Sequence, residues 1–251
     1  MLPCASGKTG CFQKQLNQLR YIGSTFILSE ETMKNPVSLV IATTNKGKTE
    51  EIKNLLADFP ITVKSLEDFP PMPAVIEDGQ TFEINACKKA VFISNILRLP
   101  ALADDSGLVV ESLGGSPGIH SARYAGENAT DEQRYTKLLD DMQGETHRKA
   151  AFRCVIAIAV PNGKCLTYSA DCEGSITRYP SGANGFGYDP VFYYPPLNKT
   201  FAELSREEKN SVSHRGKALQ KVKEDFRNVL AWISRDTSSS STETRQNEPH
   251  A

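Results

Sequence analysis

The 251-residue chain lacks the features that would assign it to a membrane or to nucleic acid. No apolar run approaches the ~18 to 20 residues that a bilayer-spanning helix needs, and the first 36 residues carry no clear signal-peptide core. A formal net charge of −1 gives no bulk attraction to nucleic acid or anionic lipid. These absences predict a cytoplasmic protein with no nucleic acid and no membrane among its partners.

The cysteines form no C-x-x-C pair and show no zinc-ligand spacing. We therefore expect reduced thiols in an intracellular protein, each packed as a small side chain. The six residues are Cys4, Cys11, Cys87, Cys154, Cys165 and Cys172.

Composition divides the chain into three parts. Residues 1–36 are polar and poorly patterned, which predicts a flexible N-terminal extension. Residues 236–251 are rich in Ser, Thr, Glu and Gln without an apolar face, which predicts a disordered tail. The 39% hydrophobic content is ample for a packed core in the domain between them, residues 37–235.

Strand and helix patterns alternate within this domain and then include a hairpin, which predicts an α/β fold with a mixed sheet. The expected strands are 38–43, 61–63, 101–110, 151–160, 164–176 and 191–194. The expected helices are 48–59, 81–97, 131–142 and 215–233.

Two adjacent carboxylates, Asp104 and Asp105, stand between two short apolar runs. Neighbouring side chains of a strand point to opposite faces, so the two cannot enter the same core. A carboxylate beside Ser106 and a glycine suits a metal ligand or a general base acting on water. An Asx-turn between two strands is the alternative that the motif alone leaves open.

Two further polar segments lie ahead of expected helices. The loop Thr43-Thr44-Asn45-Lys46-Gly47-Lys48 presents free N–H groups and a lysine, as a phosphate site or a plain capped helix would. Its spacing is not that of a Walker loop. Glu77 precedes a helix that carries Lys89, and together with Asp105 it would supply oxygen ligands for Mg²⁺; a simple charge interaction with the helix terminus is the alternative.

Two late segments suit recognition of a nucleobase. Phe186 is fixed between glycines, as a stacking platform or as a core residue in a turn. Ser213 can cap the last helix, and His214 and Arg215 then offer donors to a base edge or an oxyanion; a capped surface helix is the alternative.

Six motifs occur in order: Thr-Thr-Asn-x-Gly-Lys, Glu-x-Gly-x-Thr-Phe, Ala-Asp-Asp-Ser-Gly-Leu, Gly-Gly-x-Pro-Gly-Ile-x-Ser-Ala-Arg-Tyr, Gly-Phe-Gly-Tyr-Asp-Pro and Glu-Glu-Lys-x-x-x-Ser-His-Arg-Gly. From residue 39 to 232 the chain resembles the inosine triphosphate pyrophosphatase family, also called the Ham1 or non-canonical purine NTP pyrophosphatase family, in its bacterial XTP/dITP diphosphatase branch. One departure is Ile84, which stands where members often have Glu.

The resemblance implies an elongated mixed sheet flanked by helices, with two lobes and the active-site cleft between them (ITPase/Maf-like). It makes residues 37–235 a pyrophosphatase domain that forms a homodimer. It also implies Mg²⁺-dependent hydrolysis of a purine nucleoside triphosphate substrate, XTP, ITP or dITP, to the monophosphate and pyrophosphate.

The resemblance also assigns roles to individual residues. Asp105 would accept the proton of the attacking water and bind the metal, and Glu77 would be the second metal ligand. The remaining residues would bind substrate: Thr43, Thr44, Asn45, Lys46, Gly47, Lys48, Lys89 and Lys209 at the triphosphate, Ser106 against the substrate, and Phe186, Gly187, Tyr188, Asp189, His214 and Arg215 around the base.

Two other functions fit the same motifs. A non-catalytic purine-nucleotide sensor would use the same cleft, and a Maf-like pyrophosphatase would act on other modified nucleotides. The adjacent carboxylates argue against the sensor, because uncompensated negative charge repels phosphate unless a metal joins them.

Overall fold

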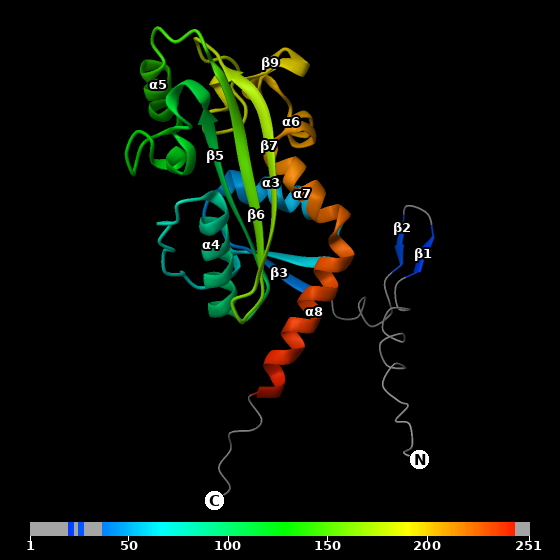
Figure 1. Cartoon of the computed structure of the whole chain (residues 1–251). Helices are drawn as coiled ribbons and strands as arrows, with labels where there is room; N and C mark the ends of the chain where they lie inside the picture. Colours follow the sequence, from blue (N-terminus) through cyan, green and yellow to red (C-terminus); the bar gives the residue numbers. More distant parts are fainter. Residues whose placement is uncertain (1–19, 23–24, 28–36, 244–251) are drawn as a thin grey trace, which may run out of the picture.

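The computed structural model describes residues 20–22, 25–27 and 37–243 (Figure 1). Seven strands form one mixed sheet in the order β4-β3-β5-β6-β7-β8-β9. They are β3 (Val37–Ile41), β4 (Ile61–Ser65), β5 (Ala101–Val110), β6 (Lys149–Ala159), β7 (Cys165–Ile176), β8 (Phe192–Tyr194) and β9 (Lys199–Thr200). β3 pairs in parallel with β4 and β5, whereas β5 to β9 pair antiparallel. The predicted α/β fold with a mixed sheet is confirmed.

The α-helices are α3 (Lys46–Leu56), α4 (Phe82–Leu97), α5 (Asp131–Asp141), α6 (Arg206–Val212), α7 (His214–Glu224) and α8 (Phe226–Glu243). Short 3-10 helices cover Leu66–Asp68, Glu111–Leu113, Gly118–Arg123, Asp189–Val191, Pro195–Leu197 and Phe201–Glu203. Among residues 20–22, 25–27 and 37–243, no helix combines the length and the apolar character that crossing a membrane requires.

Helices cover both faces of the sheet because its central strands are apolar on both sides. In β3, Leu39 and Ile41 pack with α3, α7 and α8, while Val40 packs with α4 on the other face. A third cluster gathers α5, β8 and the far ends of β5, β6 and β7. Figure 1 shows the long strands β5, β6 and β7 running between the α4–α8 end and the α5–β9 end of the molecule.

The last expected helix, 215–233, is two helices that meet at Asp225. The Asp225 carboxylate accepts a hydrogen bond from the Tyr168 hydroxyl of β7 at 2.6 Å, a tertiary contact that no local pattern announces. α8 then continues to Glu243, inside the segment whose composition predicts a disordered tail. Extending an existing helix needs no new nucleus, so polar residues can continue it. Residues 244–251 lie outside the described residues.

Most of the expected N-terminal extension also lies outside the described residues. Within it, β1 (Arg20–Ile22) and β2 (Thr25–Ile27) pair antiparallel as a separate two-stranded sheet.

The expectation that all cysteines are reduced is wrong for one pair. Cys87 of α4 and Cys165 of β7 form a disulfide whose Cα atoms lie 6.1 Å apart. The two residues are 78 positions apart, and only the packing of α4 across the sheet brings them together. Cys154 and Cys172 are free and buried, while Cys4 and Cys11 lie outside the described residues.

Candidate active site

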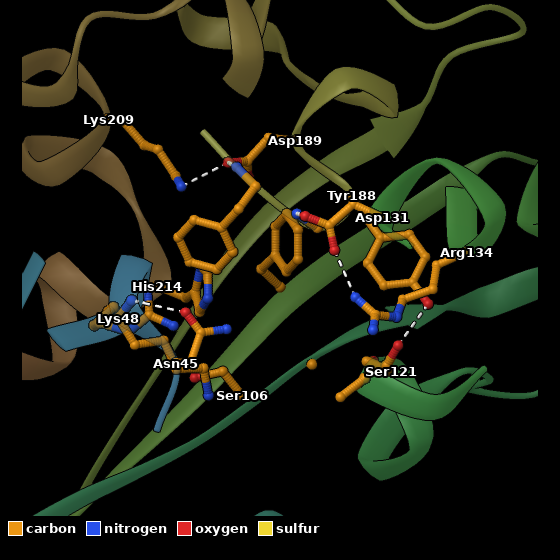
Figure 2. A pocket seen from close by; sticks show the side chains of 16 residues that line it. Asn45, Lys48, Ser106, Ser121, Asp131, Arg134, Tyr188, Asp189, Lys209 and His214 are labelled. Atoms are coloured by element: carbon orange, nitrogen blue, oxygen red, sulfur yellow. Dashed lines mark hydrogen bonds and ion pairs between the residues drawn. The ribbon is translucent and has the colours of Figure 1, made fainter. Parts of the chain in front are cut away.

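An open-mouthed pocket of about 620 Å³ lies where the motifs meet (Figure 2). Its lining includes ten of the predicted substrate-binding residues: Asn45, Lys48, Ser106, Phe186, Gly187, Tyr188, Asp189, Lys209, His214 and Arg215. It also includes six residues that received no prediction: Gly107, Ser121, Ala122, Asp131, Arg134 and Phe152.

The N-terminus of α3 forms one edge of the pocket. The Asn45 side chain caps the helix by accepting from the backbone N–H of Lys48 at 3.1 Å. Thr43 supports the cap, because its hydroxyl accepts from the backbone N–H of Asn45 at 3.2 Å. The free N–H groups and the positive end of the helix dipole therefore face the cavity beside the Lys48 ammonium.

The other residues of the α3 loop lie outside the pocket lining. Lys46 is exposed and pairs with Glu67 at 3.8 Å. Gly47 lies against Phe186: a Cβ at this position would stand only 3.0 Å from the Phe186 ring. A larger side chain would have to push the ring back by a few tenths of an ångström, so the glycine lets the loop and the ring approach closely. No contact assigns a role to Thr44.

The two adjacent aspartates point in different directions, as their places in β5 predict. Asp104 is buried and accepts from Lys48 at 2.9 Å, Arg215 at 3.2 Å and the Ser106 hydroxyl at 2.6 Å. Burial alone would raise the pKa of the Asp104 carboxyl, but Lys48 and Arg215 outweigh it and hold that pKa far below its usual range. Asp104 is therefore a charged anchor for two cationic side chains.

Asp105 instead joins Glu77 at Lys89 of α4. The Lys89 ammonium lies 3.0 Å from Asp105 and 3.2 Å from Glu77. Burial raises the pKa of the Asp105 carboxyl, although the positive charge of Lys89 opposes the shift. The same lysine has a raised pKa, because the negative charges of Asp105 and Asp104 outweigh its own burial.

The paired carboxylates fit a divalent cation of the magnesium type. Asp105 Oδ2 is buried and has no hydrogen-bond partner, so one hard oxygen is left to bind a cation. Within the part of the chain that the structure describes, no group of three or more His, Cys, Asp or Glu side chains is arranged to hold a metal. Mg²⁺ commonly uses one or two carboxylates together with substrate phosphates, and this site offers two.

An aromatic wall closes the side of the pocket formed by residues 185–189. The Phe186 ring lies 4.5 Å from the Lys209 ammonium and 5.7 Å from the Arg215 guanidinium, measured to the ring centroid. Asp189 holds this arrangement, because it accepts from the Phe186 N–H at 2.8 Å and from Lys209 at 2.7 Å. Lys209 therefore lies over the base-stacking candidate and also contacts α3, because it donates to Glu51 at 3.0 Å.

His214 lies in the same wall as a neutral imidazole. Its ring stacks on Phe152 with centroids 4.7 Å apart, and the side chain is buried. Burial and the adjacent Arg215 charge hold the pKa of His214 well below its usual value. Its Nδ1 atom is buried without a partner, which leaves it available to a ligand.

One residue of the site escaped the sequence analysis and two others were marked only by a motif. Glu51 of α3 accepts from Lys209 at 3.0 Å and from Arg215, residues 158 and 164 positions away, and no local pattern marks it. Ser121 and Ala122 fall within the quoted glycine-rich motif, which did signal their importance. Ser121 donates to the Gly118 carbonyl at 2.6 Å and accepts from the Leu108 N–H at 2.9 Å, so it fixes the rim beside β5.

These observations define an α/β protein with a cationic, aromatic-walled pocket beside paired carboxylates. The Ham1 family model matches residues 39–225, and the chain belongs to this family.

Relatives and solved structures agree with that membership. The chain is 57% identical over 195 residues to the dITP/XTP pyrophosphatase of Syntrophobacter fumaroxidans, covering 78% of this chain and 84% of that protein. It is 54% identical over 196 residues to the Geobacter sulfurreducens protein of the same name, with 77% and 96% covered. A HAM1 protein structure from Coxiella burnetii matches with a TM-score of 0.71 and 42% identity, covering 76% of this chain and 99% of that one.

Proposed function

We propose that this protein hydrolyses the non-canonical purine nucleoside triphosphates XTP, ITP and dITP to the nucleoside monophosphate and pyrophosphate, and so cleanses the nucleotide pool. The observation that carries the proposal is the meeting of Glu77, Lys89 and Asp105 at one point. None of the three is in the pocket lining, but Ser106, the residue after Asp105, is. Relatives at about half identity are named dITP/XTP pyrophosphatases, which supports the same reaction.

In this proposal the triphosphate lies along the α3 N-terminus and the base along the aromatic wall. Asn45, Lys48 and the free N–H groups of α3 bind phosphate oxygens, and Lys89 neutralises the charge that develops on them. Mg²⁺ held by Glu77, Asp105 and substrate oxygens would supply further charge neutralisation. Phosphoanhydride hydrolysis requires this positioning and neutralisation more than covalent help.

Asp105 is the proposed general base. Its buried carboxyl has a raised pKa, and a stronger base takes a proton from water more readily. Lys89 keeps the carboxylate charged and oriented at 3.0 Å. Ser106, the next residue of β5, lines the pocket and donates to Asp104, which supports a position against the substrate.

The base would be selected by donors that suit a 6-oxo purine. Lys209 and Arg215 donate only, and both lie over the Phe186 ring. A 6-oxo group accepts from such donors, whereas the 6-amino group of adenine is itself a donor and would face them without forming a hydrogen bond. ATP should therefore be a poor substrate.

Assembly and location are part of the same proposal. The family resemblance implies a homodimer, and the lack of a membrane-spanning run or a clear signal-peptide core predicts a cytoplasmic enzyme. Disulfides are uncommon in the cytosol, so a cytoplasmic location predicts that Cys87 and Cys165 are reduced in the cell, and an intact bond there would argue against it.

The direct test is a Mg²⁺-supplemented pyrophosphate-release assay of the purified chain with XTP, ITP, dITP, dTTP, GTP and ATP. We expect equal amounts of pyrophosphate and monophosphate, with XTP, ITP and dITP far ahead of ATP. Binding of ITP without any turnover would favour the sensor. A preference for dTTP or other modified nucleotides would favour the Maf-like activity.

A further inference from the structure

Arg134 is a cationic residue of the pocket that the reaction proposed above does not use. It lies in the first turns of α5, whose capping box is formed by Thr130 and Gln133. Its Nη1 atom donates to Asp131 at 2.5 Å, and the other oxygen of Asp131 accepts from the Gly187 N–H at 2.7 Å. Arg134 is thus tied, through one carboxylate, to the loop that carries Phe186.

The Nε atom of Arg134 is buried and has no hydrogen-bond partner. The whole side chain is 20% exposed and lines the pocket. A buried donor without a partner has lost its hydrogen bonds to water and gained none, which costs free energy. Such atoms in folded proteins therefore normally form a hydrogen bond to a ligand or to water. Because guanidinium groups only donate, the missing partner is a hydrogen-bond acceptor.

The position of Arg134 indicates which part of a nucleotide would supply that acceptor. In Figure 2, Arg134 and Asp131 lie across the pocket from Lys48 and Asn45, the proposed phosphate-binding residues. Arg134 shares its side of the cavity with the Tyr188 ring, whose hydroxyl donates to the Ser121 carbonyl at 2.8 Å. The Asp131 carboxylate beside Arg134 would repel a phosphate, whereas the Tyr188 ring suits a base, so this side of the pocket favours a base edge over a phosphate.

We infer that Arg134 is a specificity-determining residue that donates to a carbonyl oxygen at position 2 of the purine. Xanthine has such an oxygen, hypoxanthine has only hydrogen there, and guanine has an amino group, which is itself a donor. Arg134 would therefore favour XTP over ITP and disfavour GTP, for which two donors would face each other. This inference rests on the proposed function, because it concerns the base that the same pocket holds.

The test compares Arg134→Met with wild type and with Lys137→Met, an exposed control three residues further along α5. We expect Arg134→Met to lower kcat/KM for XTP by roughly 10- to 100-fold, the range for a lost charge-assisted hydrogen bond, and for ITP by less than about 3-fold. GTP turnover should be unchanged or higher. Lys137→Met should match wild type on every substrate.

An equal loss on XTP and ITP, or no loss on either, would overturn the inference. The equal loss would mean that Arg134 contacts the polyphosphate or ribose, or only supports the 185–189 loop. Asp131→Asn, which weakens the loop tie but keeps Arg134, should lower both substrates alike. Calorimetric binding of XMP and IMP separates this inference from the proposed function, which fails if the wild type turns over no triphosphate. Even then, tighter binding of XMP than of IMP that Arg134→Met removes would support the inference. Equal binding of XMP and IMP by the wild type would reject it.

Discussion

Replacing Glu51 with Gln is expected to destabilise the protein and weaken the base side of the pocket. The Glu51 side chain is 10% exposed and accepts from Lys209 and Arg215, which are themselves buried. Removing one partner of a buried ion pair costs roughly 3–5 kcal/mol. In the variant Lys209 would still pair with Asp189, now at 2.7 Å, and Arg215 with Asp104, now at 3.2 Å. We therefore expect a loss in the free energy of unfolding at the low end of this range, about 3 kcal/mol.

Urea unfolding followed by circular dichroism measures this loss. With a urea m-value of about 2 kcal/mol/M, the midpoint should fall by roughly 1.5 M. Glu50→Gln is the matched control, because Glu50 is 61% exposed and pairs with Arg206 at 3.0 Å on the surface, where a pair contributes about 0 to 1 kcal/mol. The KM for ITP should rise only in the Glu51 variant. Equal midpoints for the two variants would refute the assignment of Glu51 as the anchor of Lys209 and Arg215.

Two further predictions concern stability. Reducing Cys87–Cys165, or replacing Cys87 with Ser, should lower the free energy of unfolding by about 4.5 kcal/mol in the chain-entropy model for a loop of this length. Cys172→Ser should leave the effect of a reductant on stability unchanged, and thiol labelling that finds both Cys87 and Cys165 reactive without reductant would contradict the bond. The pKa of His214 is lower in the folded chain than its usual value near 6.5, so below pH 6.5 the unfolded chain takes up a proton that the folded chain does not. The free energy of unfolding should therefore fall by up to about 1.4 kcal/mol per pH unit below pH 6.5 and show no loss from this group above it. His214→Phe should flatten this part of the pH–stability curve, and an unchanged slope would show that other groups cause it.

The sequence predicts features that depend on local periodicity. The opposite directions of Asp104 and Asp105 follow from the period of two in a strand. The capping residue Ser213 is marked by its side chain ahead of a helix.

Features that depend on long-range contacts were out of reach. Glu51 has the appearance of any polar helix residue until the fold brings Lys209 and Arg215 to it. Arg134 occupies a helix position that is usually solvated, and the break at Asp225 depends on Tyr168 in a distant strand. Glu51 and Asp225 have partners more than 50 positions away, and Arg134 lines a pocket that only the complete fold creates.

The central claim is that Asp105 removes the proton from water at a site shared with Glu77 and Lys89. The most direct measurement is Mg²⁺-dependent pyrophosphate release from dITP by Asp105→Asn, with urea unfolding and dITP binding measured on the same preparation. We predict loss of turnover by at least about 100-fold, in line with the contribution of a general base, with the fold and nucleotide binding retained. A folded Asp105→Asn variant that hydrolyses dITP at the wild-type rate would contradict the claim.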